Sequence, residues 1–185
     1  ENSLLTIGGA IATPGTATVS DYLVTKSGAG TLQFTGASTS GYGITGWEAK
    51  AGRVQLVMAT GNDRYARAAD STLTIDGGAF EIVGDKTASR SQTMGGALTV
   101  GEGVSEIKVT SQLDVTTTLV LQTAGDSVKD NLTRATGATA RFVENPNLGT
   151  SVLTINTNNI AITQIPLPWA VYKDTSENND TTVAG

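Results

Sequence analysis

Apolar and polar residues alternate in short stretches along this chain, and glycines separate the stretches. The pattern is clearest between residues 26 and 58, where residues 31–35 and residues 53–57 each alternate in this way. Side chains in a strand point to opposite faces in turn, so the first stretch places Leu32 and Phe34 on one side. We therefore predict two short strands that are each preceded by a glycine turn.

The same unit recurs along the chain. Further strands are predicted at residues 4–7, 16–19, 22–25, 71–75, 79–83, 97–100 and 107–109, and the pattern continues through 119–121, 138–143 and 152–155. Residues 59–70 are the least strand-like passage and predict a short helical turn or a polar excursion from one corner of the stack. Residues 85–92 predict a second polar loop.

Many short strands joined by glycine turns are typical of antiparallel sandwiches or barrels and of parallel β-solenoids. Two-residue hairpin links favour the first, and Asp76-Gly77 is such a link. Most links instead resemble Gly28-Ala29-Gly30, which suits a chain that bends and runs on. We therefore predict an all-β fold, a parallel β-solenoid (β-helix) in which each unit buries its apolar face against neighbouring copies. The alternative is an antiparallel β-sandwich.

A change of pattern near the C-terminus divides the chain. Residues 1–165 are predicted to form the solenoid. Residues 166–169 bring two prolines, which cannot donate hydrogen bonds to a sheet. We predict that residues 166–185 form a terminal cap or a junction, followed from Lys173 by a polar tail or linker.

Composition supports strands and excludes several classes of protein. Of 185 residues, 30 are threonine and 22 are glycine, a mixture that favours strands and tight turns. Twelve basic against 17 acidic residues argue against a nucleic-acid partner, and no apolar run is long enough to predict a membrane span. The chain has no cysteine, which fits a secreted bacterial protein as well as a cytoplasmic one.

Candidate chemistry is sparse. Without histidine or cysteine, nucleophile–histidine triads and most zinc sites are impossible, and we expect no catalytic, cofactor-binding or metal-binding residues. Four acidic residues lie near one another in the sequence, at Asp63, Asp70, Asp76 and Glu81. They could converge as the acids of sugar-cleaving β-helices do, but solvated corner residues that pair locally with Arg64 and Arg67 are the simpler interpretation.

Three aromatic residues flank polar loops and are the candidate ligand contacts. Tyr42, Trp47 and Tyr65 would stack on sugar rings if they are exposed, and would fill corners of the core if they are buried. The Gly-Gly-x-Gly-x-Asp repeat that binds calcium in β-rolls is absent.

One stretch is similar to a known family. Its matching residues are Lys26, Gly28, Gly30, Thr31, Leu32, Phe34 and Gly36, followed by Ala51, Gly52, Val54 and Leu56. This pattern resembles the autotransporter-associated β-strand repeat of large secreted and surface proteins of Gram-negative bacteria, and residues 73–109 resemble a related second pattern. The resemblance implies a right-handed parallel β-helix that acts outside the cell as a passenger stalk, adhesin or surface layer. It carries no functional residues to this chain.

These observations predict a non-catalytic structural protein outside the cell or at its surface: a stalk, a surface-layer subunit or a filament subunit. Its loops could in addition act in adhesion. The expected partners are further copies of the chain or neighbouring repeats of a longer chain, and surface polysaccharide is a further candidate. A solenoid has a sheet edge at each end, which must be covered or used. The alternative is a carbohydrate-binding or carbohydrate-cleaving β-helix.

Overall fold

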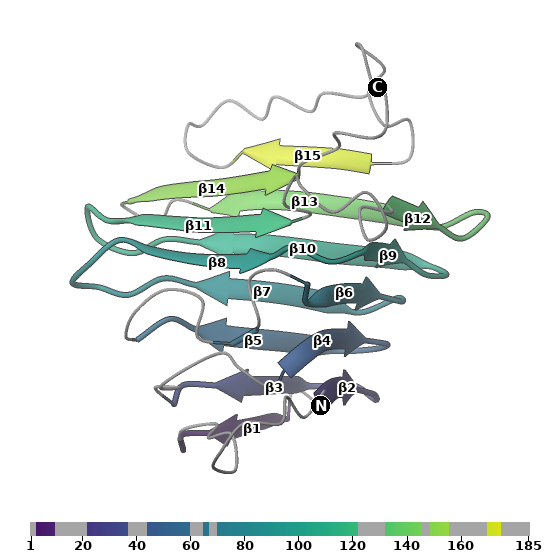
Figure 1. Cartoon of the computed structure of the whole chain (residues 1–185), viewed down its shortest axis with the longest axis horizontal. Helices are drawn as coiled ribbons and strands as arrows, with labels where there is room; N and C mark the ends of the chain where they lie inside the picture. The colour runs from purple at the N-terminus through teal and green to yellow at the C-terminus, as the bar shows by residue number, and fades with distance from the viewer. Residues whose placement is uncertain are drawn as a thin grey trace.

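The chain forms a column of stacked strands in a computed structural model, which describes residues 3–9, 22–36, 44–59, 65–66, 70–121, 132–145, 149–155 and 170–174. Within these ranges there are 15 strands and no helix. The strands belong to three sheets of seven, five and three strands, here named sheets A, B and C. The coils follow one another from the N-terminal to the C-terminal end of the column (Figure 1).

The strand bounds are as follows. Sheet A contains β1 (Leu4–Ile7), β3 (Thr31–Phe34), β5 (Arg53–Val57), β7 (Ala79–Val83), β10 (Val104–Thr110), β13 (Thr139–Asn145) and β15 (Ala170–Asp174). Sheet B contains β2 (Tyr22–Lys26), β4 (Ile44–Ala49), β6 (Thr72–Ile75), β9 (Leu98–Val100) and β12 (Leu132–Arg134). Sheet C contains β8 (Arg90–Met94), β11 (Thr116–Leu121) and β14 (Thr150–Ile155).

All pairings between these strands are parallel. The chain passes from sheet B to sheet A and then to sheet C before it returns to sheet B one level higher, as in β6, β7 and β8. The predicted all-β fold with parallel strands is therefore confirmed, and the arrangement is consistent with a β-solenoid. The antiparallel sandwich is wrong, because each strand pairs with the equivalent strand of the next coil rather than with its neighbour in sequence.

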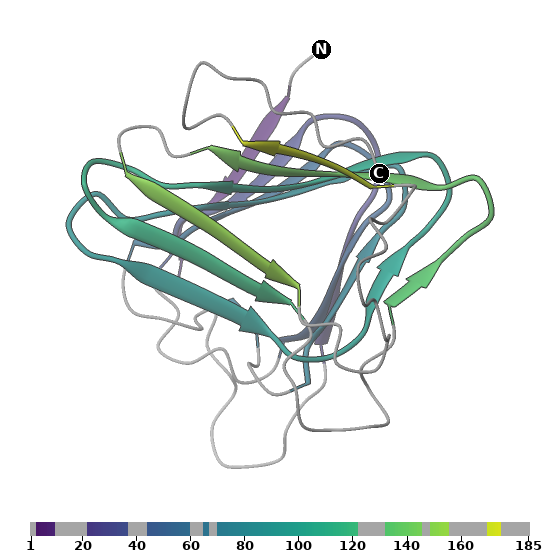
Figure 2. The same cartoon turned by 90° about the horizontal axis from the view of Figure 1, so that it is seen from above.

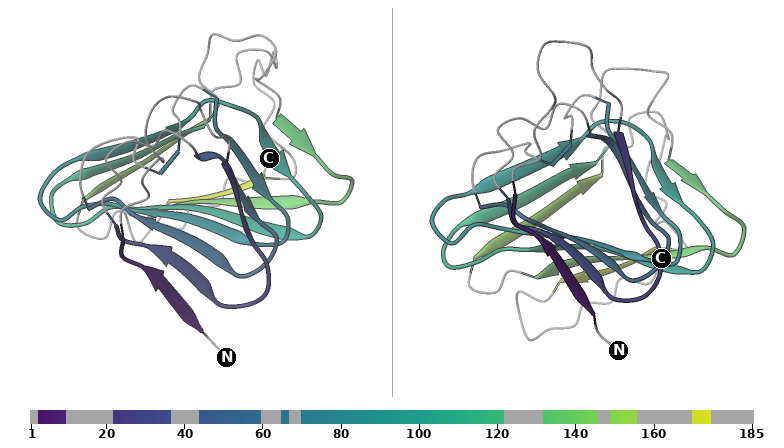
Figure 3. Two further views of the ribbon diagram at one scale, coloured as in Figure 1. Left: turned by 60° about the horizontal axis from the view of Figure 1, so that its bottom comes forward. Right: turned by 90° about the horizontal axis from the view of Figure 1, so that it is seen from below.

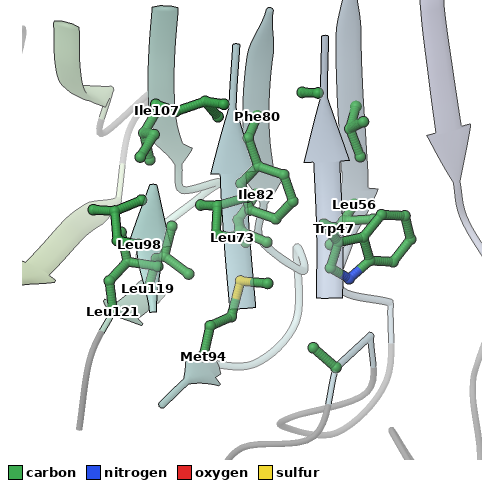
Figure 4. Packing of buried hydrophobic residues seen from close by; sticks show 14 of the residues in the cluster. Trp47, Leu56, Leu73, Phe80, Ile82, Met94, Leu98, Ile107, Leu119 and Leu121 are labelled. Carbon is green, nitrogen blue, oxygen red and sulfur yellow. The ribbon is translucent and has the colours of Figure 1, made fainter. Parts of the chain in front are cut away.

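The three sheets enclose the hydrophobic core. Viewed along the column, they form the sides of a triangle (Figures 2 and 3). The parallel register places Val54, Phe80 and Ile107 one above another in sheet A, and all three are fully buried. Leu73 and Leu98 form a corresponding column in sheet B (Figure 4). Alternation within each strand thus produces columns of apolar side chains, each covered by the next coil.

The predicted polar loop at residues 85–92 is partly wrong. Residues 90–94 form β8, the first strand of sheet C, and Gln92 within it is fully buried. A turn at Asp85 precedes this strand. The Asp85 carboxylate accepts hydrogen bonds from Thr87 and from Arg90. The sequence Arg-Ser-Gln-Thr-Met lacks the aliphatic alternation of the other strands, so its strand character comes from the β11 ladder beside it.

The corners between sheets B and A are short and are built by glycines. Those with positive φ in the described residues are Gly28, Gly30, Gly52, Gly77, Gly103 and Gly137. The corners also stack: the backbone N–H of Arg53 donates to the carbonyl oxygen of Gly30 at 2.9 Å, and that of Ala79 donates to Gly52 at 2.8 Å. The predicted glycine corners are thus confirmed at residues 28–30, and they continue the backbone ladder around the bend.

The C-terminal segment contributes one more strand. Within the expected cap or junction at residues 166–185, residues 170–174 form β15, which pairs with β13 and makes one edge of sheet A. Lys173 and Asp174 therefore belong to a strand. The remaining residues of this segment, and the strand predicted at residues 16–19, lie outside the described residues.

Candidate functional site

A continuous polar network covers the outer face of sheet A, and Glu81 of β7 is its centre. The Glu81 carboxylate accepts hydrogen bonds from Arg53 at 2.8 Å, from Gln55 at 2.9 Å and from Thr110 at 2.9 Å. Lys108 forms an ion pair with it at 3.3 Å. The Glu81 side chain is only 6% exposed, because the longer side chains of β5 and β10 cover it from both sides. The expectation that Glu81 is a solvated corner residue is therefore wrong.

The network extends over five coils, from β3 to β13. Arg53 also reaches Glu106 at 3.2 Å, two coils away, because the intervening position in the column is the small residue Ala79. Arg141 approaches Glu106 from the other side at 3.6 Å. Toward the N-terminus, the ladder continues through a hydrogen bond from Gln33 to Gln55. The outer face of this sheet is thus tied together by side chains as well as by its backbone ladder.

The surroundings of Glu81 favour its ionised form. Burial by itself would raise the pKa of Glu81, but the hydrogen bond from Gln55, the charge of Lys108, the Thr110 hydroxyl and the charge of Arg53 together outweigh it, and the pKa is lowered. A general acid needs a raised pKa and an accessible carboxyl group. Glu81 has neither, so its geometry suits a structural ion-pair centre rather than acid catalysis.

We expect this ion-pair centre to make stability depend on pH. A carboxylate with a lowered folded-state pKa stabilises the fold above its unfolded pKa, and this contribution is lost as the pH falls below about 4.3. Glu81→Gln should therefore lower the free energy of unfolding by about 1–2 kcal/mol at pH 7, and by less at pH 3. Urea unfolding at both pH values measures the difference.

The matched control is Glu102→Gln, which removes the same charge from an exposed corner residue. It should change stability by less than about 0.5 kcal/mol at either pH. Equal losses for Glu81→Gln at pH 7 and pH 3 would contradict the assignment of Glu81 as the centre of an ion-pair network.

Two of the three candidate ligand-contact residues lie in the core. Trp47 belongs to β4 and is fully buried, and Tyr65 is 1% exposed. The Trp47 indole donates from Nε1 to the carbonyl oxygen of Tyr65 at 2.8 Å and packs edge-on against Phe34, with ring centroids 5.1 Å apart. This corrects the ligand-contact expectation for both residues, because neither offers a ring face to solvent. Tyr42 lies outside the described residues.

Tyr65 and Ala66 close the side of the column where sheet C is missing. Sheet C begins at β8, so the described parts of the earlier coils have strands only in sheets A and B. The buried Gln92 side chain of β8 accepts from the Tyr65 N–H at 3.0 Å and donates to the Ala66 carbonyl oxygen at 3.4 Å. The expectation of a polar excursion at residues 59–70 is therefore wrong for these two residues, which plug the core.

The Tyr65 hydroxyl is hydrogen-bonded to the neighbouring coils, and we expect it to ionise at a higher pH than an exposed tyrosine. Its single O–H can donate to the carbonyl oxygen of Gly36, at 3.0 Å, or to that of Val57, and both oxygens lie within hydrogen-bond distance. Burial raises the pKa of Tyr65 to about 12, so its contribution to stability is present below about pH 10 and is lost at higher pH. An ultraviolet absorbance titration should show a late component near pH 12 that belongs to Tyr65.

Tyr65→Phe should remove this late component and cost about 1–2 kcal/mol of stability. Tyr22→Phe, at an exposed position, is the control and should leave the late component unchanged. A late component that survives Tyr65→Phe would contradict the assignment.

The described acidic residues do not assemble into a catalytic or metal-binding group. Asp76 lies in the β6–β7 corner, Glu81 lies on the outer face of sheet A, and Asp63 is outside the described residues. No group of three or more metal-ligating side chains of histidine, cysteine, aspartate or glutamate occurs in the described part of the chain. A search of the same residues for a helix long and apolar enough to cross a membrane found none.

Comparison with known proteins found no matching protein family, no matching curated protein and no matching solved structure.

Proposed function

We propose that this chain is a structural segment of an extracellular or cell-surface protein, built as a right-handed β-helix and acting as a stalk, surface-layer element or filament element without catalytic activity. The observation that carries the proposal is the uninterrupted column of parallel strands. Right-handedness follows from the general rule that connections between parallel strands of one sheet are right-handed.

The organisation of the outer face supports a mechanical role. The charged side chains on sheet A are directed toward one another across successive coils, with Glu81 linked to Arg53 and Lys108, and Glu106 linked to Arg141. Such a network joins coils along the column axis in addition to the backbone hydrogen bonds. It leaves no ionised carboxylate of the network free for proton transfer, which fits a rod better than an enzyme.

The composition is compatible with a location outside the cell and does not by itself distinguish it from the cytoplasm. A chain without cysteine has no thiols to be oxidised in a secretory compartment. Its sparse charge and many threonines also agree with the repeat that it resembles. Trp47 and Tyr65 are buried and therefore offer no ring face for a carbohydrate to stack on.

Antibody labelling of whole cells tests the proposal. An antibody raised against the purified chain is applied to intact and to permeabilised cells of the organism that encodes it. We expect equal labelling of both samples and loss of the signal after treatment of intact cells with an external protease. Labelling that requires permeabilisation would overturn the proposed location, and an antibody to a cytoplasmic protein is the control for cell integrity.

A further inference from the structure

Exposed apolar side chains are concentrated at the N-terminal end of the column in the described part of the chain. Seven large hydrophobic side chains are exposed in the described residues, and five of them lie on the edge strands β1 and β2: Leu4, Leu5, Ile7, Tyr22 and Leu23. Leu5 is 62% exposed. A groove of about 340 Å³ is lined by residues of β1, β2, the corner that follows β2, and β3. Exposed apolar surface that is concentrated in one place marks an interaction site.

The exposed side chains continue the interior columns of sheet A. Leu5 is in register with Leu32, and Ile7 is in register with the buried Phe34. Along the rest of the column, each such position is covered by the equivalent residue of the next coil. Leu5 and Ile7 are exposed because no coil follows on their outer side among the described residues. Another coil would bury them, and in the register of sheet A the residues of β15 in these two columns are Tyr172 and Asp174.

The β1 edge also lacks the usual protection against strand pairing. Its sequence, Leu-Leu-Thr-Ile, contains no charge and no proline, the features with which soluble proteins block edge strands. By contrast, the corresponding end of sheet C is covered by Tyr65 and Ala66, whose backbone is bound by Gln92 of β8. Sheet C is thus closed at this end, while the edge of sheet A presents an unprotected strand.

We propose that this end binds the C-terminal end of a second copy of the chain, with β15 of one copy adding as a parallel strand to β1 of the next. β1 and β15 are the two edge strands of one fully parallel sheet. If a second copy is placed end to end along the column axis, its β1 lies beside β15 of the first copy, and the two strands run parallel. A two-fold dimer through β1 would instead make an antiparallel pair, which occurs nowhere among the described pairings.

Partly buried apolar side chains occur at both ends of the column. Leu132, Leu153 and Ile155 are only partly buried at the ends of sheets B and C, and Val24 and Leu32 are partly buried at the opposite end. In sheet B, Leu132 and Val24 occupy the last and first positions of one column of paired residues. β12 lies one coil before β15, and β2 lies one coil after β1, so pairing of β15 with β1 joins the copies through sheet A and leaves the ends of sheet B about 14 Å apart. A head-to-tail contact of this kind does not close on itself and produces a filament.

Engineered disulfides test the contact directly. Continuing the sheet A register across the contact places Thr6 opposite Lys173 of the neighbouring copy, because both belong to one column of paired residues. Neighbouring strands are about 4.8 Å apart, which suits a disulfide, whereas the two positions within one chain are about 29 Å apart. The chain has no cysteine of its own. Mild oxidation of the Thr6→Cys, Lys173→Cys double variant should give a ladder of dimers, trimers and larger species.

The single variants decide between the arrangements. A mixture of Thr6→Cys and Lys173→Cys chains should give the mixed dimer in preference to either homodimer. A dominant Thr6→Cys homodimer would overturn the head-to-tail contact in favour of a two-fold one. Monomers under all conditions would also overturn it, and would point to other residues of a longer chain as the partner of β1.

A charge in the contact provides a second measurement. Leu5→Lys should weaken association by about tenfold or more in sedimentation experiments, because it would place an ammonium group in the desolvated contact. Val104→Lys is the control, since Val104 is 76% exposed but lies in the middle of the column, and its association should match that of the wild type. Equal association of Leu5→Lys and wild type would contradict the contact. This inference rests on the proposed structural role. If the antibody labels intact cells but the cysteine variants do not cross-link, the surface role stands and only the filament contact is rejected.

Discussion

Trp47→Ala is expected to destabilise the fold by about 3–5 kcal/mol, the range for removing a large buried aromatic side chain. Trp47 contacts Phe34 edge-on and lies with its ring centroid 6.4 Å from that of Phe80, so one residue joins sheets A and B in the core. It also holds the Tyr65 carbonyl oxygen, and its loss would release the plug on the open side of the column. Urea unfolding followed by circular dichroism measures the change.

Trp47→Phe separates packing from hydrogen bonding. It keeps an aromatic ring in the core but loses the indole N–H, so we expect a smaller loss of about 1–3 kcal/mol. If Trp47→Ala cost less than Trp47→Phe, the ring would be strained rather than stabilising, and the assignment of Trp47 as the link between the two sheets would be wrong.

Gly52→Ala is expected to have the second largest effect, a loss of about 2–4 kcal/mol. Gly52 has a φ of +66°, a conformation that side chains with a Cβ adopt at a cost. An added Cβ would also lie 2.3 Å from the carbonyl oxygen of Gly30, in the corner of the neighbouring coil. The substitution would therefore push two stacked corners apart, and thermal unfolding should show a clear decrease in midpoint.

Gly28→Ala is the matched control for this substitution. Its φ of +78° is similar, but an added Cβ would meet nothing within 4 Å. We expect a loss of about 1–2 kcal/mol from backbone conformation alone. The difference between the two variants then measures the close approach of adjacent corners, and equal losses would contradict that approach.

Much of the fold could be predicted from the sequence, because local pattern and tertiary environment agree in most strands. Residues 4–7, 53–57 and 79–83 are strands within the predicted bounds. In residues 53–57 and 79–83 the apolar residues alternate because one face of each strand covers the core. The glycine corner at residues 28–30 was also predictable, since positive φ favours glycine in any short bend.

The rest depends on contacts that no local pattern encodes. Tyr65 and Gln92 lie in polar sequences, and their burial follows from hydrogen bonds to each other and to distant coils. Glu81 alternates as an outward-facing residue should, but its burial depends on Arg53 and Lys108 from adjacent strands. Period-two alternation says which side a residue faces and nothing about what covers it. The candidate site could therefore not be predicted, and the family resemblance stays a prediction.

The corners from sheet B to sheet A are uniformly short, while the remainder of each coil varies in length. Thr31 pairs with Arg53, whereas Val104 pairs with Thr139 after a much longer path. The stacked corners between sheets B and A thus form a spine of constant geometry along the column. Differences in coil length occur in the other connections. An epitope grafted at exposed Lys86 and Thr87, between β7 and β8, would be displayed at a set height while that spine keeps its spacing.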